Sequence, residues 1–166
     1  DGQYLQVNHR FAEMLGCSRE EFLTMSPQDF AHPHERAGIE QDRKRILNGE
    51  ISNVTGERRF VRKDGRVIWA NRTLSLARDS AGQPIYFIGV VEDITESKER
   101  EVSYRAMFEN AAVGITRGEL NGVLVDMNQK FCDMLDCTRD ELVGKAIQDI
   151  THPDDYGRGA QLRGQV

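Results

Sequence analysis

Histidine, cysteine and closely spaced carboxylates form most catalytic and metal sites, and this sequence carries four histidines and three cysteines. No Ser-His-Asp arrangement and no His-Glu-x-x-His motif can be assembled from it. Aspartate and glutamate are plentiful but scattered, and no glycine-rich loop that could hold a phosphate is present. The sequence therefore predicts no catalytic site, no metal site and no enzymatic activity for this stretch of chain.

The three cysteines also predict no disulfide framework and no metal site. Cys17, Cys132 and Cys137 contain no Cys-x-x-Cys pair, and an odd count without a framework favours a reducing compartment. We interpret Cys17 and Cys137 as small buried apolar residues that follow a helix.

Composition excludes two broad classes of partner. The formal net charge of −5 argues against a nucleic-acid partner, which would require a basic face. The longest apolar run, Ile85–Val91, is far too short to cross a bilayer.

No signal peptide and no initiating methionine are present, so we expect an internal piece of a longer protein. We expect it to be cytoplasmic, or the cytoplasmic part of a membrane-associated sensor.

One sequence pattern occurs twice in the chain. Leu15–Glu35 reads LGCSREEFLTMSPQDFAHPHE, and Leu135–Asp155 reads LDCTRDELVGKAIQDITHPDD. Matching residues are always 120 positions apart, with no gap over 35 positions. This period is the length of a small domain, so the chain holds two copies of one domain. The first copy lacks its front and the second lacks its back.

The hydrophobic periodicity predicts the order of the elements. A short strand at Tyr4–Val7 precedes a run of short helices, of which the last is Pro33–Leu47. The period then changes to two, which predicts strands at residues 56–62, 66–78 and 84–93. Tight turns join these three strands into an antiparallel meander. Helices inserted among antiparallel strands predict an α+β fold with the helices on one face of the sheet.

Local signals fix the helix ends of the first copy. Asn8 is a suitable N-cap, and Gly16 can adopt the left-handed conformation that ends a helix. Ser18 and Glu21 have the spacing of a capping box.

The motif set N-x-x-F-x-x-M-L-G-x-S-R-E-E-F, H-P, R-K-D-G-R-V-I-W and G-Q-P-I-Y-F-I-G-V-V-E-D-I-T-E resembles a PAS domain with its C-terminal PAC motif. The resemblance implies a five-stranded antiparallel sheet with helices on one face. It places a first PAS/PAC domain at residues 1–95, without its front strand, and a linker helix at 96–110. Phe108–Ile115 resembles the start of a second PAS domain, whose N-terminal half occupies 111–166.

PAS domains differ in the cofactor or ligand that they bind, so each cofactor must be predicted from the residues that would hold it. Haem-binding relatives take an axial ligand from the long helix, which here contains no histidine or cysteine between residues 36 and 47. His32 and His34 lie just before that helix, where a structural cap explains His32 better than haem ligation does. The photoactive flavin subfamily needs a cysteine in an NCRFLQ-like stretch, and Cys17 lies elsewhere. The resemblance therefore predicts neither haem nor photoactive flavin and leaves a small-molecule ligand open.

Two functions remain open at this point. In the first, the domain senses a small molecule in a pocket between sheet and helices; in the second, it is a ligand-free dimerisation and interaction scaffold. Arg43 and Asn71 distinguish them, because inward-facing polar groups need a partner. The candidate pocket residues are Phe30, Ile39, Arg43, Ile46, Phe60, Trp69, Asn71, Leu74 and Ile88.

The triplet Asp93-Ile94-Thr95 matches the family motif that leads into an output helix. We expect it to relay signals to a downstream output domain, such as a histidine kinase or a diguanylate cyclase. Thr95 is the expected cap of the linker helix, with Ser97 as the alternative.

Self-association is the expected partnership. If the front strand of copy one is missing, the strand containing Ile85–Val91 has a bare apolar edge. The predicted first strand of copy two, Val113–Arg117, could fill that place in a neighbouring chain and form a swapped dimer or oligomer. The alternative is that the front strand simply lies outside this sequence.

Overall fold

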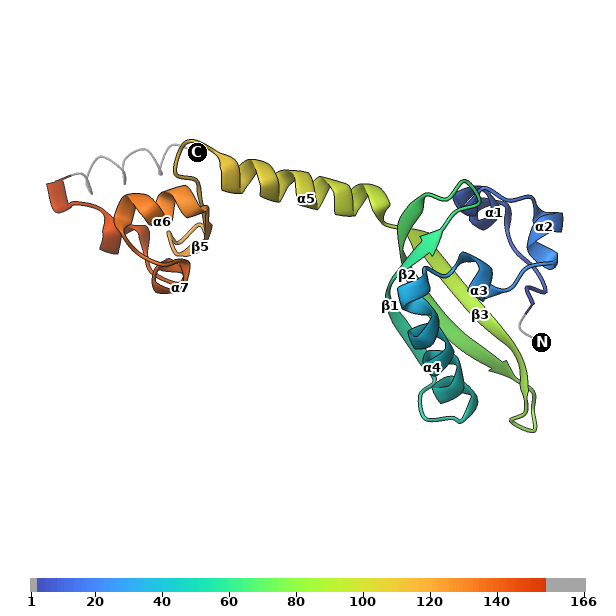
Figure 1. Cartoon of the computed structure of the whole chain (residues 1–166). Coiled ribbons are helices and arrows are strands. Elements are labelled where there is room, and N and C mark those ends of the chain that lie inside the picture. The colour runs from blue at the N-terminus through green and yellow to red at the C-terminus, as the bar shows by residue number, and fades with distance from the viewer. Residues whose placement is uncertain (1–2, 155–166) are drawn as a thin grey trace. The chain divides into compact units, whose positions relative to one another are not determined.

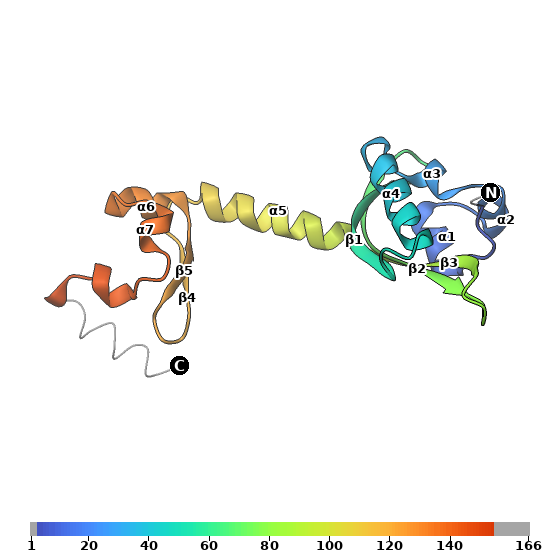
Figure 2. The same cartoon turned by 90° about the horizontal axis from the view of Figure 1, so that it is seen from below.

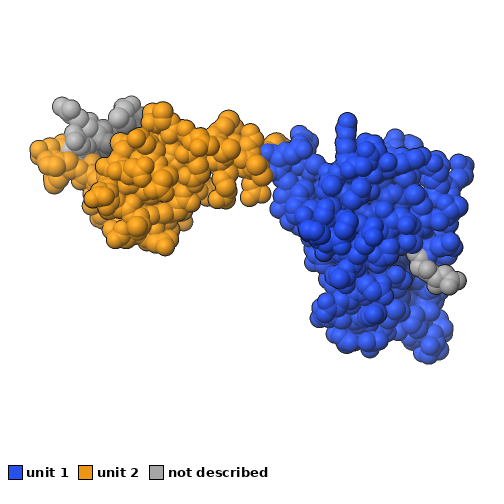
Figure 3. Space-filling model, viewed as in Figure 1, with its two compact units in different colours: residues 1–99 blue, residues 100–166 orange. Residues whose placement is uncertain are grey.

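The computed structural model describes residues 3–154 of the chain, which divides into two compact units, residues 1–99 and 100–166 (Figure 3). Residues 155–166, which belong to the predicted second domain, lie outside the described residues. The elements of residues 1–99 are α1 (His9–Leu15), α2 (Arg19–Leu23), α3 (Pro27–Phe30), η1 (Pro33–Glu35), α4 (Arg36–Leu47), β1 (Asn53–Val61), β2 (Val67–Arg78) and β3 (Pro84–Asp93). Helix α5 (Thr95–Asn110) crosses the boundary, and β4 (Thr116–Gly118), β5 (Leu124–Met127), α6 (Gln129–Leu135), α7 (Arg139–Leu142) and η2 (Ile147–Ile150) follow it (Figure 1).

Short helices form where the sequence supplies their caps. The Asn8 side chain accepts a hydrogen bond from the Phe11 N–H at 2.9 Å and begins α1. Gly16 ends α1 in the left-handed conformation, with φ of 73°. Ser18 and Glu21 form the predicted capping box at the start of α2. These predictions are confirmed.

Strands β1, β2 and β3 form the predicted antiparallel meander, in the order β1-β2-β3. Along β2 the even-numbered residues from Ile68 to Leu74 are buried, and the residues between them are less so. The helices of the first unit lie on one side of this sheet, and we call the side that they cover its inner face (Figure 2). The predicted α+β fold with helices on one face is confirmed.

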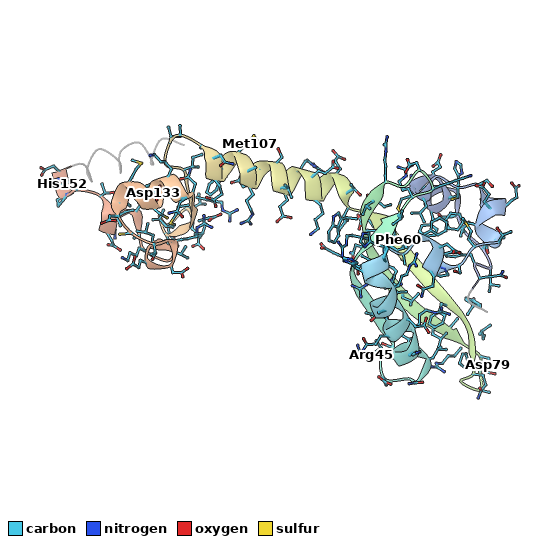
Figure 4. The ribbon with its side chains drawn as sticks, in the orientation of Figure 1. Arg45, Phe60, Asp79, Met107, Asp133 and His152 are labelled. Atoms are coloured by element: carbon cyan, nitrogen blue, oxygen red, sulfur yellow. The ribbon has the colours of Figure 1, made fainter. Side chains whose placement is uncertain are left out.

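An aromatic cluster fills the core between α1, α2, α3 and the sheet. The Phe22 ring lies 5.2 Å from Tyr4 and from Phe11, and 4.8 Å from Phe30. Phe60 of β1 belongs to the same core and points towards the helices (Figure 4). Burial of these large rings against the inner face holds the helical layer to the sheet.

The strand predicted at Tyr4–Val7 is wrong. These residues form no strand, although the Tyr4 N–H reaches the Met25 carbonyl at 3.5 Å and Val7 is buried. A strand needs a partner for its backbone groups. By the repeat offset, the partner of Tyr4–Val7 would correspond to β4, and its position falls before residue 1 of this sequence.

The second unit supports that explanation. Leu124–Met127, which corresponds to Tyr4–Val7 in the repeat, is strand β5 and pairs with β4 in an antiparallel hairpin. The expected first strand Val113–Arg117 overlaps β4 but begins too early. A small core of Leu124, Met127, Cys132 and Leu142 holds the hairpin against α6 and α7.

Helices long and apolar enough to cross a membrane are absent from residues 3–154.

Candidate functional site

A buried charged cluster lies between α4 and the inner face of the sheet in the first unit. We call Asp42, Arg58 and Arg72 the arginine cluster. Asp42 shares the buried side of α4 with Ile39 and Ile46. Its Oδ2 atom accepts hydrogen bonds from the Arg58 guanidinium at 2.9 Å and from the Arg72 guanidinium at 3.3 Å. One carboxylate oxygen therefore serves one arginine from β1 and another from β2.

The arginine cluster carries more positive than negative charge. The side chain of Arg72 is only 8% exposed, and the Nε atoms of Arg58 and Arg72 are buried without a hydrogen-bond partner. Burial lowers the pKa of Arg72, and the nearby Arg58 lowers it further, whereas Asp42 acts in the opposite direction. A charged pair inside a protein normally has its donors satisfied, so this cluster is electrostatically incomplete.

Five of the predicted pocket residues lie in the interior of the first unit and are at most 8% exposed: Phe30, Ile39, Ile46, Phe60 and Leu74. Arg43 of α4 also faces the sheet, with its guanidinium 5.3 Å from the centre of the Phe87 ring and 3.7 Å from Glu40.

The described residues also line a pocket of about 350 Å³ near the end of α4, but only Ile46 of the predicted set borders it. The pocket is lined by Ile46, Gly49, Ile51, Ser52, Leu76 and Arg78.

The other three predicted pocket residues lie on the outer face of the sheet. Trp69 and Asn71 alternate with the buried residues of β2, and Ile88 of β3 is 46% exposed. Ile88 pairs with Ser75, which shares the face of Asn71. Asn71 is therefore not the inward-facing polar group; its neighbour Arg72 is. Strict alternation could have identified Arg72 from the sequence, because Leu74 cannot share a face with Asn71.

The joint between β3 and α5 brings the predicted relay residues together. The Asp93 Oδ1 atom accepts a hydrogen bond from the Thr95 N–H at 2.9 Å. Thr95 accepts one at its hydroxyl from the Trp69 N–H at 3.0 Å, and Ile94 donates its N–H to the Trp69 carbonyl at 2.9 Å. Thr95 therefore ties α5 to β2, while the capping bond to the start of the helix comes from Asp93.

Trp69 is the centre of this joint on the outer face. Its ring lies 5.5 Å from the Arg59 guanidinium and 5.6 Å from the Lys98 amine. Lys98, in the first turn of α5, also forms an ion pair with Glu57 of β1 at 2.7 Å. The start of α5 is thus held by side chains of two strands as well as by the Trp69 backbone.

The other end of α5 is held within the second unit. Phe108 is buried, and its carbonyl accepts a hydrogen bond from the Asn128 amide at 2.9 Å. Glu109 accepts hydrogen bonds from the Gln129 N–H at 3.0 Å and from Arg139 at 2.6 Å. The Arg139 hydrogen bond is the main cause of the lowered pKa of Glu109.

Comparison with known families agrees with this architecture. A family model described as the PAS fold matches residues 4–91, more than half of the chain, and a PAS domain model matches residues 103–164. The chain belongs to the PAS family. The tandem arrangement indicated by the repeat is confirmed.

Proteins that resemble this chain include signalling enzymes. It is 29% identical over 141 residues to the probable diguanylate cyclase DgcE of Escherichia coli, which covers 81% of this chain and 13% of that protein. It is 26% identical over 101 residues to the sensor histidine kinase TmoS of Ectopseudomonas mendocina, which covers 61% of this chain and 10% of that protein. The chain therefore spans only a small part of these relatives.

A solved PAS domain of a protein from Colwellia psychrerythraea has a similar fold. It superimposes with a TM-score of 0.53 at 21% identity, over 57% of this chain and 80% of that one. At this identity the likeness supports the fold alone.

Proposed function

We propose that this chain is a sensory relay module, which passes a change in the first PAS unit through α5 towards an output domain. The observation that carries the proposal is the attachment of α5 at both ends. Thr95 is bonded to Trp69 at the start of α5, and Phe108 and Glu109 are bonded to Asn128 and Gln129 at its end. A helix attached in this way couples the packing of one unit to that of the next.

The output chemistry lies in a separate domain under this proposal. The relatives named as a diguanylate cyclase and a histidine kinase are both far longer than the matched region. Either activity in the full protein would suit a cytoplasmic PAS module. The predicted absence of enzymatic activity within residues 1–166 remains a prediction.

The joint explains how a change inside the first unit could reach α5. Trp69 lies between the core residues Ile68 and Ala70 on β2, and Arg72 is three residues further along. The backbone of Trp69 uses both its N–H and its carbonyl to hold Ile94 and Thr95. Any shift of β2 caused at the arginine cluster therefore acts directly on the start of α5.

Asp93→Ala tests the joint, because it removes the bond to the Thr95 N–H and leaves the core intact. We expect faster hydrogen exchange in the first turn of α5 and a loss of about 1 kcal/mol in stability, as for other caps. In the full-length protein, the signal-dependent change in output should be lost. Normal output regulation in this variant would contradict the relay.

Asp79→Ala is the matched control. The Asp79 side chain makes the same kind of bond, accepting from the Ala81 and Gln83 N–H groups at 2.9 and 2.8 Å in the turn between β2 and β3 (Figure 4). Its loss should cost a similar free energy and leave output regulation unchanged. A loss of regulation in both variants would indicate general destabilisation rather than a specific joint.

Exposed apolar side chains favour self-association as a second function. Val90 on the outer face of β3 is 64% exposed, and Val102 and Met107 of α5 are 69% and 66% exposed. Figure 4 labels Met107 on α5. Strand β3 is also the edge of its sheet within the described residues. Such surfaces are typical of contacts between copies of a chain.

Sedimentation of the wild-type chain should therefore reveal a dimer, and Val90→Lys or Met107→Lys should weaken it. A monomer at high concentration would contradict self-association. The exchange of a strand between chains stays a prediction, which a structure of the dimer would test.

A further inference from the structure

We propose that Arg58 and Arg72 bind the carboxylate of a small organic anion, whose apolar part lies over Gly89 on the inner face of the sheet. The inference deepens the proposed function, because it names the chemical class of the signal that the first unit would sense. It stands on the charge of the arginine cluster and on the space beside it.

The arginine cluster has too few acceptors for its donors. Asp42 offers one carboxylate to two guanidinium groups, so the arginine cluster has one positive charge in excess. The buried Nε atoms of Arg58 and Arg72 have no acceptor. A buried positive charge that exceeds the charge of its carboxylate partner is unfavourable, and a second carboxylate would supply the missing charge and further acceptors.

Glycine provides space next to these donors. Gly89 of β3 pairs directly with the buried Leu74, so it belongs to the inner face. A Cβ atom at Gly89 would meet no atom of the described residues within 4 Å, and Gly89 itself is exposed. Val91, the next inner-face residue of β3, pairs with Arg72. Gly89 is therefore a diagonal neighbour of Arg72 across the two strands, at about 7–8 Å. The inner face is therefore open at Gly89, one diagonal step from Arg72.

The neighbours of this space select the ligand. Phe87 and Val91 flank Gly89 on the inner face, and both are half-buried. They offer an apolar surface to a ligand whose carboxylate is held by the guanidinium groups. The excess of one charge favours a monocarboxylate such as benzoate or hexanoate over a more highly charged anion.

Gly56 shows why the space lies on the β3 side. It pairs with Arg72 from the opposite strand, but a Cβ there would lie 3.4 Å from the Arg58 Nη1 atom. The Arg58 side chain thus covers the inner face at Gly56 and leaves it open at Gly89.

The test uses the 166-residue chain and the fluorescence of Trp69, its only tryptophan. Thermal unfolding is followed with benzoate, hexanoate, acetate or inorganic phosphate, each against chloride at equal ionic strength. Benzoate and hexanoate should raise the unfolding midpoint in a saturable manner, and more than acetate or phosphate do. Equal midpoints in all salts would overturn the proposal, and calorimetric titration with benzoate gives the affinity directly.

Two variants remove the two parts of the site separately. Arg72→Met removes the excess charge and leaves Asp42 paired with Arg58, so the fold should survive while the benzoate affinity falls by about tenfold or more. Gly89→Val fills the space with a residue that suits a strand, and should abolish the response without any change of charge. Wild-type affinity in Gly89→Val would overturn the proposal even if Arg72→Met failed to fold.

Arg66→Met is the control for charge, because Arg66 lies in the exposed turn between β1 and β2. It should bind benzoate as the wild type does. Asp42→Asn leaves two arginines without their carboxylate, so its midpoint should fall and benzoate should restore more of it than it adds to the wild type. An anion-insensitive Asp42→Asn would contradict the proposal.

Failure of the ligand site and failure of the relay give different results. Asp93→Ala should keep the benzoate affinity of the wild type, because the joint makes no part of the site. Loss of regulation with intact binding supports both proposals, whereas no binding in any form of the chain refutes the ligand site and leaves the relay standing.

Discussion

Residues 4–8 and residues 124–128 occupy the same place in the repeat and adopt different structures. Leu124–Met127 is a strand paired with β4, whereas Tyr4–Val7 forms no strand. Both segments enter the next helix through an asparagine cap, Asn8 or Asn128. The difference therefore arises from what each segment meets in space, because the local signals are shared.

The two asparagines make this plain. Both accept a hydrogen bond from the backbone N–H three residues on, at Phe11 or Phe131. Asn128 is 0% exposed and also accepts from the Ile115 N–H, while its amide donates to the carbonyls of Phe108 and Val113 at 2.9 Å each.

The corresponding partners of Asn8 would precede residue 1 of this sequence, and Asn8 is exposed. The same repeat position is thus only a helix cap in the first unit, at Asn8. In the second unit, at Asn128, it is also a connector that joins the end of α5 and the approach to β4 to the start of α6. A cap therefore depends on local sequence, whereas a connector depends on segments that come before it in the chain.

The largest effect is expected from breaking the connector. Asn128→Ala would remove four side-chain hydrogen bonds, although the Phe131 N–H keeps the backbone carbonyl of residue 128 as an acceptor at 3.1 Å. The loss should destabilise the second unit by about 3–4 kcal/mol. Hydrogen exchange at the Ile115 and Phe131 amides in the full chain measures the loss. The end of α5 should loosen in the same variant, because the Phe108 carbonyl loses its donor.

Asn8→Ala is the repeat-matched control. It removes one capping bond and should cost about 1 kcal/mol. Urea unfolding followed by Trp69 fluorescence reports this change, because Trp69 lies in the first unit. Equal losses in the two variants would show that the three further bonds of Asn128 add nothing to its role as a cap.

The sequence predicts the features that depend on neighbouring residues better than those that depend on distant segments. The caps at Asn8, Gly16 and Ser18 and the three strands of the meander depend on neighbours in sequence, and the sequence predicts them. At the start of α5 the sequence predicts Thr95 or Ser97 as the cap, whereas the bond to the Thr95 N–H comes from Asp93. The Tyr4–Val7 strand failed because strand formation needs a partner from elsewhere in the chain. Its apolar content alone does not indicate which segment would pair with it.

The candidate site was predicted only in part. Apolar residues such as Ile39 and Phe60 were expected in the interior because burial follows hydrophobicity. Asn71, one of the predicted pocket residues, lies on the outer face, and the buried polar residue of β2 is its neighbour Arg72. The pairing of Arg72 with Asp42 joins residues 30 positions apart, and nothing local in the sequence indicates it.

The approach to β4 in the second unit leaves no room for a side chain at Gly114. A Cβ atom at Gly114 would lie 3.0 Å from the Met134 Sδ atom and 3.2 Å from the Phe131 Cα atom. Gly114→Ala should therefore push the entrance of β4 away from α6 and destabilise the second unit by about 2 kcal/mol. Hydrogen exchange along β4 and β5 would detect the change.

Gly38→Ala is the control of opposite sign in the first unit. A Cβ at Gly38 of α4 meets no atom of the described residues within 4 Å. The substitution should stabilise the first unit by up to about 1 kcal/mol, because alanine favours the helix. Destabilisation at Gly38, or tolerance at Gly114, would show that space around the glycines does not decide the outcome.

The smallest effect concerns pH at the end of α5. The hydrogen bond from Arg139, followed by that from the Gln129 N–H, lowers the pKa of Glu109 in the folded protein. A lowered pKa means that Glu109 stabilises the fold above its unfolded pKa of about 4.3, and that this contribution is lost as the pH falls through the folded pKa. The attachment of α5 to the second unit should therefore lose the contribution of Glu109 in acid, while the buried Phe108 and its bond to Asn128 remain.

Glu109→Gln isolates this contribution. The wild type should exceed the variant in unfolding midpoint at pH 7, and the difference should vanish at acid pH once Glu109 is protonated in both states. Added salt should also reduce the difference, because Arg139 and Glu109 are both partly exposed. The first unit has no counterpart of Glu109 within this sequence, so hydrogen exchange in α1 should not respond to the substitution at any pH. A pH-independent difference would mean that the glutamate acts through its shape and hydrogen bonds rather than its charge.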